Sequence, residues 1–405
     1  MSTTTLGSGI RASLPHDWKL VELGNLCDHK LGKMLDRQKN EGVSRPYLRN
    51  PNVKWFEFDL TDVKKMPIKD SEREKYSVRP GDVIVCEGGE AGRAAIWDGE
   101  AEEMYIQKAL HRVRVGAELH NRYLVYVLMA DAKSGHLNSY FTGTTIPHFT
   151  GQDLHRYEIP LPPLSEQKRI ADILDKADAI RRKRQAAIDG LLQIPGSAFH
   201  AMFGTPAHNT KGWKIGTIRD LVEDVKYGSS SKACAVGKYP MLRMNNITYE
   251  GTWNLSDLKY IDLDEKDLPK YLARKGDILF NRTNSKELVG KTAVFQEDIP
   301  MAFAGYLVRA RTNKLAHPDY ISGYLNSPHG KATLRHMCKN IVGMANINAQ
   351  SFQDILIPHP PIEAQLEYVR LLNGVRQSEK PLRRAFNESA LFFHSLVQRV
   401  FRGEL

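Results

Sequence analysis

Cysteine is scarce in this 405-residue sequence, and the four that occur are far apart. Cys27, Cys86, Cys234 and Cys338 form no CxxC pair and have no paired histidines nearby, so neither a zinc site nor a disulfide framework is predicted. No hydrophobic run approaches the ~18 residues of a membrane span. Residues 1–13 lack the apolar centre of a signal peptide and form a polar leader. We therefore expect a cytoplasmic protein without membrane contact and with a disordered leader.

Acidic residues are also in deficit relative to basic ones. The chain has 47 Asp and Glu against 57 Lys and Arg, and its pI is ≈ 9.2. A basic surplus favours an anionic partner such as nucleic acid but does not prove one. The hydrophobic content of 41% is that of a globular protein, and the length allows two or more domains with cores of their own.

A long polar helix is predicted after the prolines at 160, 162 and 163. Proline fixes φ and pushes its neighbours toward extended conformations, so the helix begins near Ser165. Its length of about 29 residues, at ~1.5 Å each, gives a rod of ~43 Å. Apolar residues at gaps of three, four and seven predict a coiled-coil seam, with Arg184 as its misfit. The seam residues are Ile170, Ile173, Ala177, Ile180, Ala187 and Leu191.

A second amphipathic helix near the end of the sequence can cover this seam. Its apolar residues have the same spacing: Leu372, Val375, Leu382, Phe386, Phe393 and Leu396. Pro381 predicts a kink or restart in this helix, and Pro195-Gly196 predicts a break near the end of the first.

The chain contains an internal repeat with a nearly constant offset of about 195 residues. The matched landmarks are Trp18 with Trp213, Arg49 with Arg243, Gly81 with Gly276, and Gly92 with Gly290. Each copy has short strands and turns followed by one long helix. We predict an α+β fold, with two tandem domains of mixed α and β structure separated by two long helices that form an antiparallel coiled coil with pseudo-two-fold symmetry.

Each copy also predicts the same local elements. Gly-Asp turns lead into buried strands at 83–86 and 278–281, and the next strands lie at 94–97 and 292–295. Short helices are predicted at 123–132 and 320–326.

The sequence contains partial matches to two catalytic motifs, but neither motif is complete. Glu87 after Gly-Asp superficially matches a metal-dependent nuclease, but Gly89 replaces the expected lysine and Arg282 replaces Glu87 in the second copy. An adenine methyltransferase needs an Asn/Asp-Pro-Pro-aromatic loop, whereas the Pro-Pro pairs at 162–163 and 360–361 precede helices. No GxGxxG follows a strand. We expect the chain itself to be non-catalytic and to hold no cofactor or metal.

Five segments in this order resemble the specificity subunit of a type I restriction-modification enzyme, from about Leu14 onward. They are PHDWKLVELGNL, IPLPPLSEQKRIADILD, AMFGTPAHNTKGW, GDILFNRTNSKELVGKTAVF and QRVFRGEL. The resemblance implies that each domain is a target recognition domain for one half of a bipartite site in double-stranded DNA. It also implies two modification subunits that carry S-adenosylmethionine and methylate adenine, and restriction subunits that translocate and cut.

The expected boundaries follow from the repeat and the resemblance. They are residues 14–164 for the first recognition domain, 165–204 for the first spacer helix and linker, 205–362 for the second recognition domain, and 363–405 for the second spacer helix.

Specificity is expected where the two copies differ, because shared positions maintain the common fold. Arginine can fork onto guanine, asparagine onto adenine, and glutamate can accept from cytosine. The candidate DNA contacts are Arg49, Asn50, Asn52, Glu87 and Thr145 in the first copy, and Arg243, Asn245, Asn246, Arg282, Asn284 and Lys286 in the second. Arg49 and Arg243 match each other, which fits phosphate anchoring better than base reading. A solvated loop residue is the alternative at every position.

A protein of another class remains open as an alternative. The coiled coil would then be a scaffold that joins two protein-binding domains. The basic surplus and the Arg- and Asn-rich loops argue against this reading, and DNA retention by the assembled complex distinguishes the two.

Overall fold

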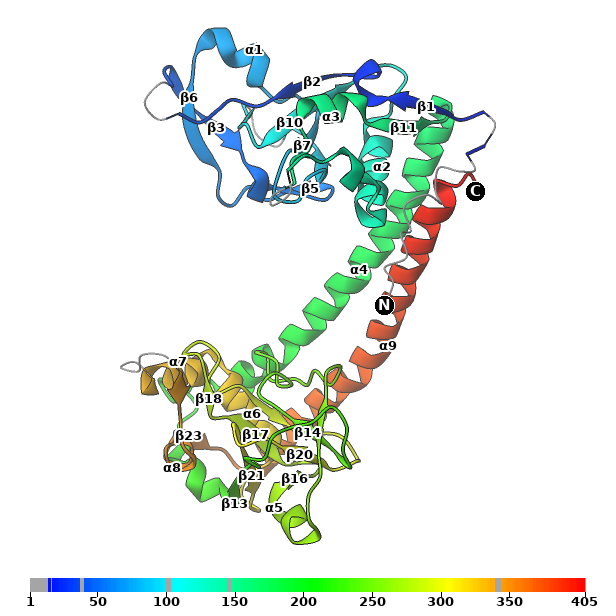
Figure 1. Cartoon of the computed structure of the whole chain (residues 1–405). Coiled ribbons are helices and arrows are strands. Elements are labelled where there is room, and N and C mark those ends of the chain that lie inside the picture. Colours follow the sequence, from blue (N-terminus) through cyan, green and yellow to red (C-terminus); the bar gives the residue numbers. More distant parts are fainter. Residues whose placement is uncertain are drawn as a thin grey trace. The chain divides into compact units, whose positions relative to one another are not determined.

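The computed structural model describes residues 14–15, 17–36, 40–99, 103–143, 147–338 and 344–404 (Figure 1). The predicted disordered leader, residues 1–13, lies outside these ranges. The chain divides into two units: the first comprises residues up to Gln185 together with those from Ala385, and the second comprises Ala186–Arg384. Across the described ranges, no helix has both the length and the hydropathy needed to cross a bilayer.

The first unit is built on a four-stranded antiparallel sheet in the order β2-β10-β7-β8. These strands are β2 (Cys27–Leu31), β10 (Leu110–Val115), β7 (Val83–Cys86) and β8 (Ala94–Ile96). The smaller sheets are β6 (Lys64–Ile68) with β3 (Val43–Leu48) and β9 (Tyr105–Ile106), β1 (Lys19–Glu22) with β11 (Glu158–Leu161), and β4 (Val53–Lys54) with β5 (Glu57–Phe58). The short helices are α1 (Arg73–Tyr76), α2 (Asn121–Ser134) and α3 (Gly151–Arg156).

The second unit repeats this plan with the sheet order β13-β21-β17-β19. These strands are β13 (Val222–Tyr227), β21 (Leu307–Thr312), β17 (Ile278–Asn281) and β19 (Thr292–Val294). A second four-stranded sheet contains, in order, β15 (Lys259–Ile261), β14 (Tyr239–Leu242), β20 (Met301–Phe303) and β16 (Leu272–Ala273). Two further sheets have two strands each. They are β12 (Lys214–Thr217) with β23 (Leu356–His359), and β18 (Thr283–Asn284) with β22 (Ala345–Asn346). The short helices are α5 (Leu268–Tyr271), α6 (Pro318–Asn326), α7 (Pro328–Met337) and α8 (Ala349–Gln353).

The predicted Gly-Asp turns and buried strands are confirmed in both units. Gly81 and Gly276 each have φ +91°, a left-handed conformation that glycine adopts without a Cβ clash. All four residues of β7 and of β17 are buried. The registers also correspond, since Leu110 pairs with Cys86 and Leu307 with Asn281.

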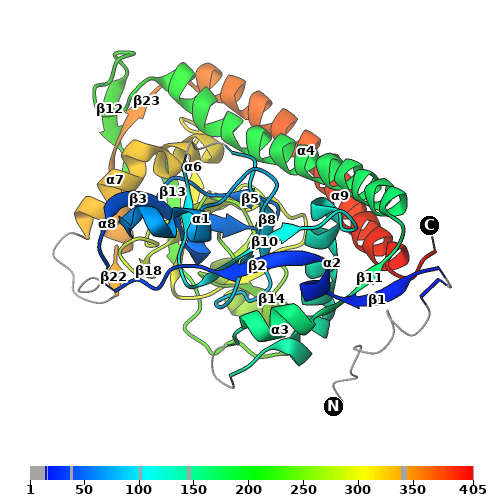
Figure 2. The same ribbon diagram turned by 90° about the horizontal axis from the view of Figure 1, so that it is seen from above.

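Two long helices provide the elements that both units share. Helix α4 (Leu164–Phe203) and helix α9 (Ile362–Val400) run antiparallel and side by side in both views (Figures 1 and 2). In the first unit, the start of α4 and the end of α9 enter one hydrophobic core. In the second, Phe199 and Phe203 near the end of α4 pack against Tyr368 near the start of α9. The predicted fold class and antiparallel coiled coil are confirmed.

The buried stripe of α4 follows a longer period than the predicted seam. Ile180 and Ala187, both assigned to the seam, are exposed, Ile180 to 51%, whereas Leu174 and Ile188 are buried. Ala177, Ile188 and Phe199 are buried at 11-residue intervals. An 11-residue repeat gives 3.67 residues per turn, close to an undistorted helix, so a strict heptad drifts off the packed face.

The other predicted seam residues lie at two levels of burial. Ile170, Ala177, Leu372, Val375, Phe393 and Leu396 are buried, and Ile173, Leu191, Leu382 and Phe386 are half-buried. Arg184, the predicted misfit, is half-buried, and its Nη1 donates to the Ala385 carbonyl at 2.5 Å. The guanidinium therefore bonds across the helix pair.

Neither proline ends its helix, so the predicted restart at Pro381 and break at Pro195 are wrong. Pro195 lies inside α4 and Pro381 inside α9. Proline removes one hydrogen bond and crowds the carbonyl four residues earlier. At Pro381 this carbonyl belongs to Gln377, and both residues are exposed, so water can satisfy the freed acceptor.

Candidate nucleic-acid interface

The same turn occurs in both units, at residues 49–52 and 243–246, and carries six of the candidate contacts. In the first unit, Asn52 accepts from the Arg49 backbone N–H at 2.9 Å, and its amide donates to the carbonyls of Asp59 and Asp62. In the second unit, Asn246 accepts from the Arg243 backbone N–H, also at 2.9 Å. The Asn246 amide donates to the carbonyls of Asn254 and Asp257. Both asparagines are 2% exposed, so they hold the turn and cannot reach a base.

The two arginines of this turn form the same ion pair. Arg49 donates to a carboxylate oxygen of Asp62 at 2.8 Å, and Arg243 donates to Asp257 at 2.8 Å. Hydrogen bonds from Lys64 and then Arg49 lower the pKa of Asp62, and the hydrogen bond from Arg243 lowers that of Asp257. Arg49 and Lys64 also line an open groove of about 490 Å³. The arginines are thus oriented by the fold while they border solvent.

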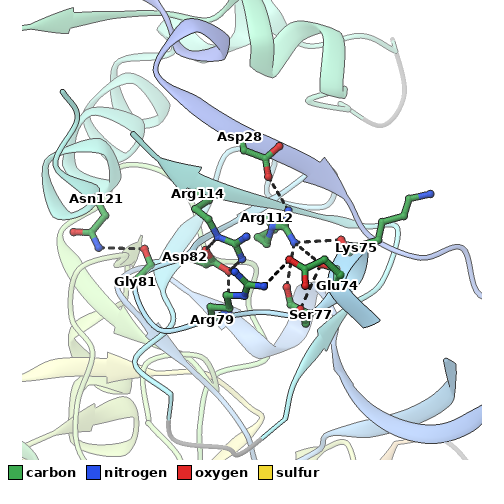
Figure 3. Close-up of polar contacts among 10 residues, drawn as sticks. All are labelled: Asp28, Glu74, Lys75, Ser77, Arg79, Gly81, Asp82, Arg112, Arg114 and Asn121. Carbon is green, nitrogen blue, oxygen red and sulfur yellow. Dashed lines mark hydrogen bonds and ion pairs between the residues drawn. The ribbon is translucent and has the colours of Figure 1, made fainter. Parts of the chain in front are cut away.

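A second duplicated network lies behind the β7 and β17 turns. In Figure 3, Asp82 lies between Arg114 and Arg79. Arg112 donates to Asp28 and to the carbonyls of Glu74 and Lys75 in α1 and of Ser77 just after it. The second unit has the same network: Arg311 donates to Asp277 at 2.8 and 3.2 Å, and Arg309 donates to Asp224 and to the Leu272 carbonyl. Asp82, Arg112, Asp277 and Arg309 are the buried members of this network. The network holds the sheet and its turn together, and sequence inspection did not single it out.

The first variable loop, Glu87–Glu90, follows β7 and is held from several sides. The Asn50 amide donates to the Gly88 carbonyl at 2.8 Å. Glu90 accepts from Trp55 Nε1 at 2.9 Å and from Arg93 at 2.6 Å. Among the described residues, the Glu87 carboxylate forms no hydrogen bond or ion pair. The structure therefore places Asn50 beside the loop and leaves Glu87 as its available acceptor.

A further segment of the first unit approaches the same loop. The Phe149 backbone N–H donates to the Glu87 carbonyl at 2.6 Å, and a Cβ at Gly88 would meet His148 at 3.3 Å. Thr145, a predicted contact, lies outside the described residues. His148 was not predicted, and no motif in the sequence marks it.

The second variable loop, Arg282–Leu288, follows β17. Its start is extended as β18, which pairs with β22. The Arg282 guanidinium lies over the Tyr227 ring at 4.9 Å, and the Asn284 side chain accepts from the Ser285 backbone N–H at 2.9 Å. Lys286 is half-buried. Asn245 is exposed on the turn formed by residues 243–246. Tyr227 and Tyr306 are 43% and 50% exposed, and neither was predicted from the sequence as a contact.

A basic residue follows each variable loop at a matched position: Arg93 in the first unit and Lys291 in the second. Arg93 donates to the Asn50 carbonyl at 2.9 Å, and Lys291 donates to the Met244 and Ile247 carbonyls at 2.7 and 2.6 Å. Burial lowers the pKa of Lys291. The matched Gly-Arg and Gly-Lys pairs at 92–93 and 290–291 were a signal for this role.

The two variable loops and the residues beside them carry polar, charged and aromatic side chains. Their side chains offer a carboxylate, a guanidinium, amides and exposed aromatic rings, which suit hydrogen bonding and stacking to nucleic acid. Within the ranges that the structure describes, no three His, Cys, Asp or Glu side chains group so as to hold a metal ion.

These features define a class of protein: two domains of one architecture, an antiparallel helix pair, and variable loops on a duplicated scaffold. The family model described as the type I restriction modification DNA specificity domain matches the chain twice, over residues 15–189 and 210–380. The chain belongs to this family.

Relatives and solved structures agree with this assignment. The chain is 23% identical to the EcoKI specificity subunit of Escherichia coli K12, over 97% of this chain and 90% of the relative. It is also 23% identical to the StySPI specificity subunit of Salmonella potsdam, over 98% and 90%. The S subunit of the M. genitalium type I system has a TM-score of 0.58, with 15% identity and 98% of both chains covered. A chain from a study of complex assembly in a type I system has a TM-score of 0.59, with 18% identity, covering 97% and 99%. At these identities the solved structures show a shared fold.

Proposed function

We propose that this chain is the specificity subunit of a type I restriction-modification complex and binds double-stranded DNA. Each unit reads one half of an asymmetric bipartite site. The chain is non-catalytic and docks two modification subunits, which carry S-adenosylmethionine and methylate adenine, and restriction subunits that translocate and cut. The complex acts in the cytoplasm, where it meets DNA.

One observation carries this proposal: the scaffold is duplicated while the loops on it differ. The turns at Asn52 and Asn246 have the same hydrogen bonds, yet the loops that follow β7 and β17 carry different side chains. Two readers with one architecture and different loops suit a site with two different halves. The helix pair then specifies a gap of unread base pairs between them.

The predicted boundaries describe functional segments within the two units. We propose recognition domains at 14–164 and 205–362 and spacer segments at 165–204 and 363–405. Asn52 and Asn246 are left out of the proposed DNA contacts because they are buried. Arg49 and Arg243 remain phosphate anchors, and Asn50, Glu87, Thr145, Asn245, Arg282, Asn284 and Lys286 remain proposed contacts.

A loop exchange tests the assignment of one unit to each half-site. Residues 87–91 are replaced by an unrelated loop of equal length, and the chain is coexpressed with its modification subunits in a host whose methylated motifs are then mapped. We expect one half of the motif to change and the other to persist. A change in both halves would refute the domain-by-domain assignment. A complex that assembles but retains no specific DNA would favour the scaffold alternative.

A further inference from the structure

Glu87 and Arg282 occupy the same backbone position in the two units. The Glu87 N–H donates to the Ala109 carbonyl at 2.9 Å, and the Arg282 N–H donates to the Tyr306 carbonyl at 3.0 Å. The carbonyls of Glu87 and Arg282 accept from Phe149 and Ile347 at 2.6 and 2.8 Å. Both residues follow matched buried strands, β7 and β17. The main chain is therefore held alike, while the side-chain charge is reversed.

Charge reversal at an equivalent position argues against a shared phosphate contact. Phosphate anchors should be basic in both copies, as at Arg49 and Arg243, because both units face the same polyanion. Glu87 would be repelled by a phosphate. A carboxylate in one copy and a guanidinium in the other instead match the different edges of different bases.

The surroundings of Arg282 restrict its orientation. Its guanidinium lies over Tyr227 at 4.9 Å, its Nη1 makes a long 3.4 Å contact with the Gly305 carbonyl, and its Nε is buried without a hydrogen bond. His111 of β10 pairs with Leu31, and its counterpart Val308 pairs with Tyr227. At this matched position the first unit has Leu31 and the second unit has the aromatic Tyr227, beside the arginine.

A guanidinium fixed on an aromatic face presents a planar fork of donors. In the major groove, guanine offers the matching acceptor pair, O6 and N7, whereas cytosine offers an N4 amino donor to a carboxylate. We propose that Arg282 reads a guanine in the half-site of the second unit and that Glu87 reads a cytosine in the half-site of the first. This inference rests on the proposed function and assigns two of its base-reading residues.

Motif mapping of three single variants tests it, with each chain assembled with its modification subunits. For Arg282→Gln, we expect discrimination at one guanine position to fall about 10- to 100-fold, with the other half of the motif unchanged. For Glu87→Gln, the loss should occur at one cytosine position in the opposite half. Glu287→Gln is the matched control, because Glu287 is an exposed acid in the second loop, and its motif should be that of the parent.

A duplex carrying 7-deazaguanine at the assigned position gives a second measurement. The modified base lacks N7, so the parent complex should bind it more weakly in competition assays, while the Arg282→Gln complex should not distinguish it from guanine. Weaker binding of Arg282→Gln to all sequences with an unaltered motif would overturn the inference and leave the proposed function standing. Failure of the parent complex to bind any specific duplex would instead remove the proposed function itself.

Discussion

His111, which lies beneath the first variable loop, can be protonated, whereas its counterpart in the second unit cannot. His111 lies on β10, is fully buried, and shares a hydrogen bond of 2.8 Å with the Phe149 carbonyl. Burial, with a smaller contribution from the nearby His29, lowers the pKa of His111 to about 4, although the hydrogen bond to the Phe149 carbonyl opposes this shift. His29 in turn contacts His155 of α3 at 3.3 Å. In the second unit the position of His111 is held by Val308.

We therefore expect acid to destabilise the first unit through His111. Between pH ~6.5 and ~4 the unfolded chain binds a proton at His111 that the folded chain excludes, so the free energy of unfolding falls as the pH falls through this window. The full effect is about 3 kcal/mol. His111→Val should flatten this part of the dependence, as followed by urea unfolding at several pH values. An unchanged slope in the variant would show that His111 is not responsible.

Among the elements, α4 offers a matched pair of positions that lie about one and two-thirds helical turns apart. Leu174 is fully buried in the core of the first unit, and Ile180 is 51% exposed. Leu174→Ala should reduce the free energy of unfolding by about 2–5 kcal/mol, because it leaves a cavity. Ile180→Ala should change it by no more than about 0.5 kcal/mol. Urea unfolding followed by circular dichroism measures both variants. An equal decrease in the free energy of unfolding for both would support the predicted heptad seam.

The sequence could predict elements whose cause is local. The Gly-Asp turns need a left-handed glycine, and a continuous apolar run follows, so β7 and β17 were predictable. The burial of Ile188 in place of Ile180 depends on the slow drift of a helix against its partner, which short spacings do not resolve. Asn52 looks like a surface residue until Asp59 and Asp62 are seen to supply its acceptors from across the turn.

The part of the candidate site that follows from comparing the two copies was predictable from the sequence. Alignment of the two copies places Glu87 opposite Arg282 without any structure. The stacking of Arg282 on Tyr227 joins residues 55 positions apart and depends on the pairing of β13 with β21, which no local pattern specifies.

On the scale of the whole molecule, each unit takes half of α4 and half of α9. A cut between α4 and β12 therefore divides the chain without separating the packed helices. We expect a protein with a protease site inserted between Thr205 and Gly212 to elute as one species after cleavage, although a denaturing gel shows two pieces. Separate elution of the pieces would show that the helix contacts are too weak to hold the units together.

The core of the first unit includes residues from the far end of the sequence. The Tyr123 ring of α2 lies 5.9 Å from that of Phe401, and Phe393 and Leu396 enter the same core. A ribosome adds about 5–20 residues per second, so about 10–40 s separate the synthesis of Gln185 from that of Ala385. Throughout this interval the nascent first unit exposes the apolar surface that α9 later covers. The domain made first is thus completed last.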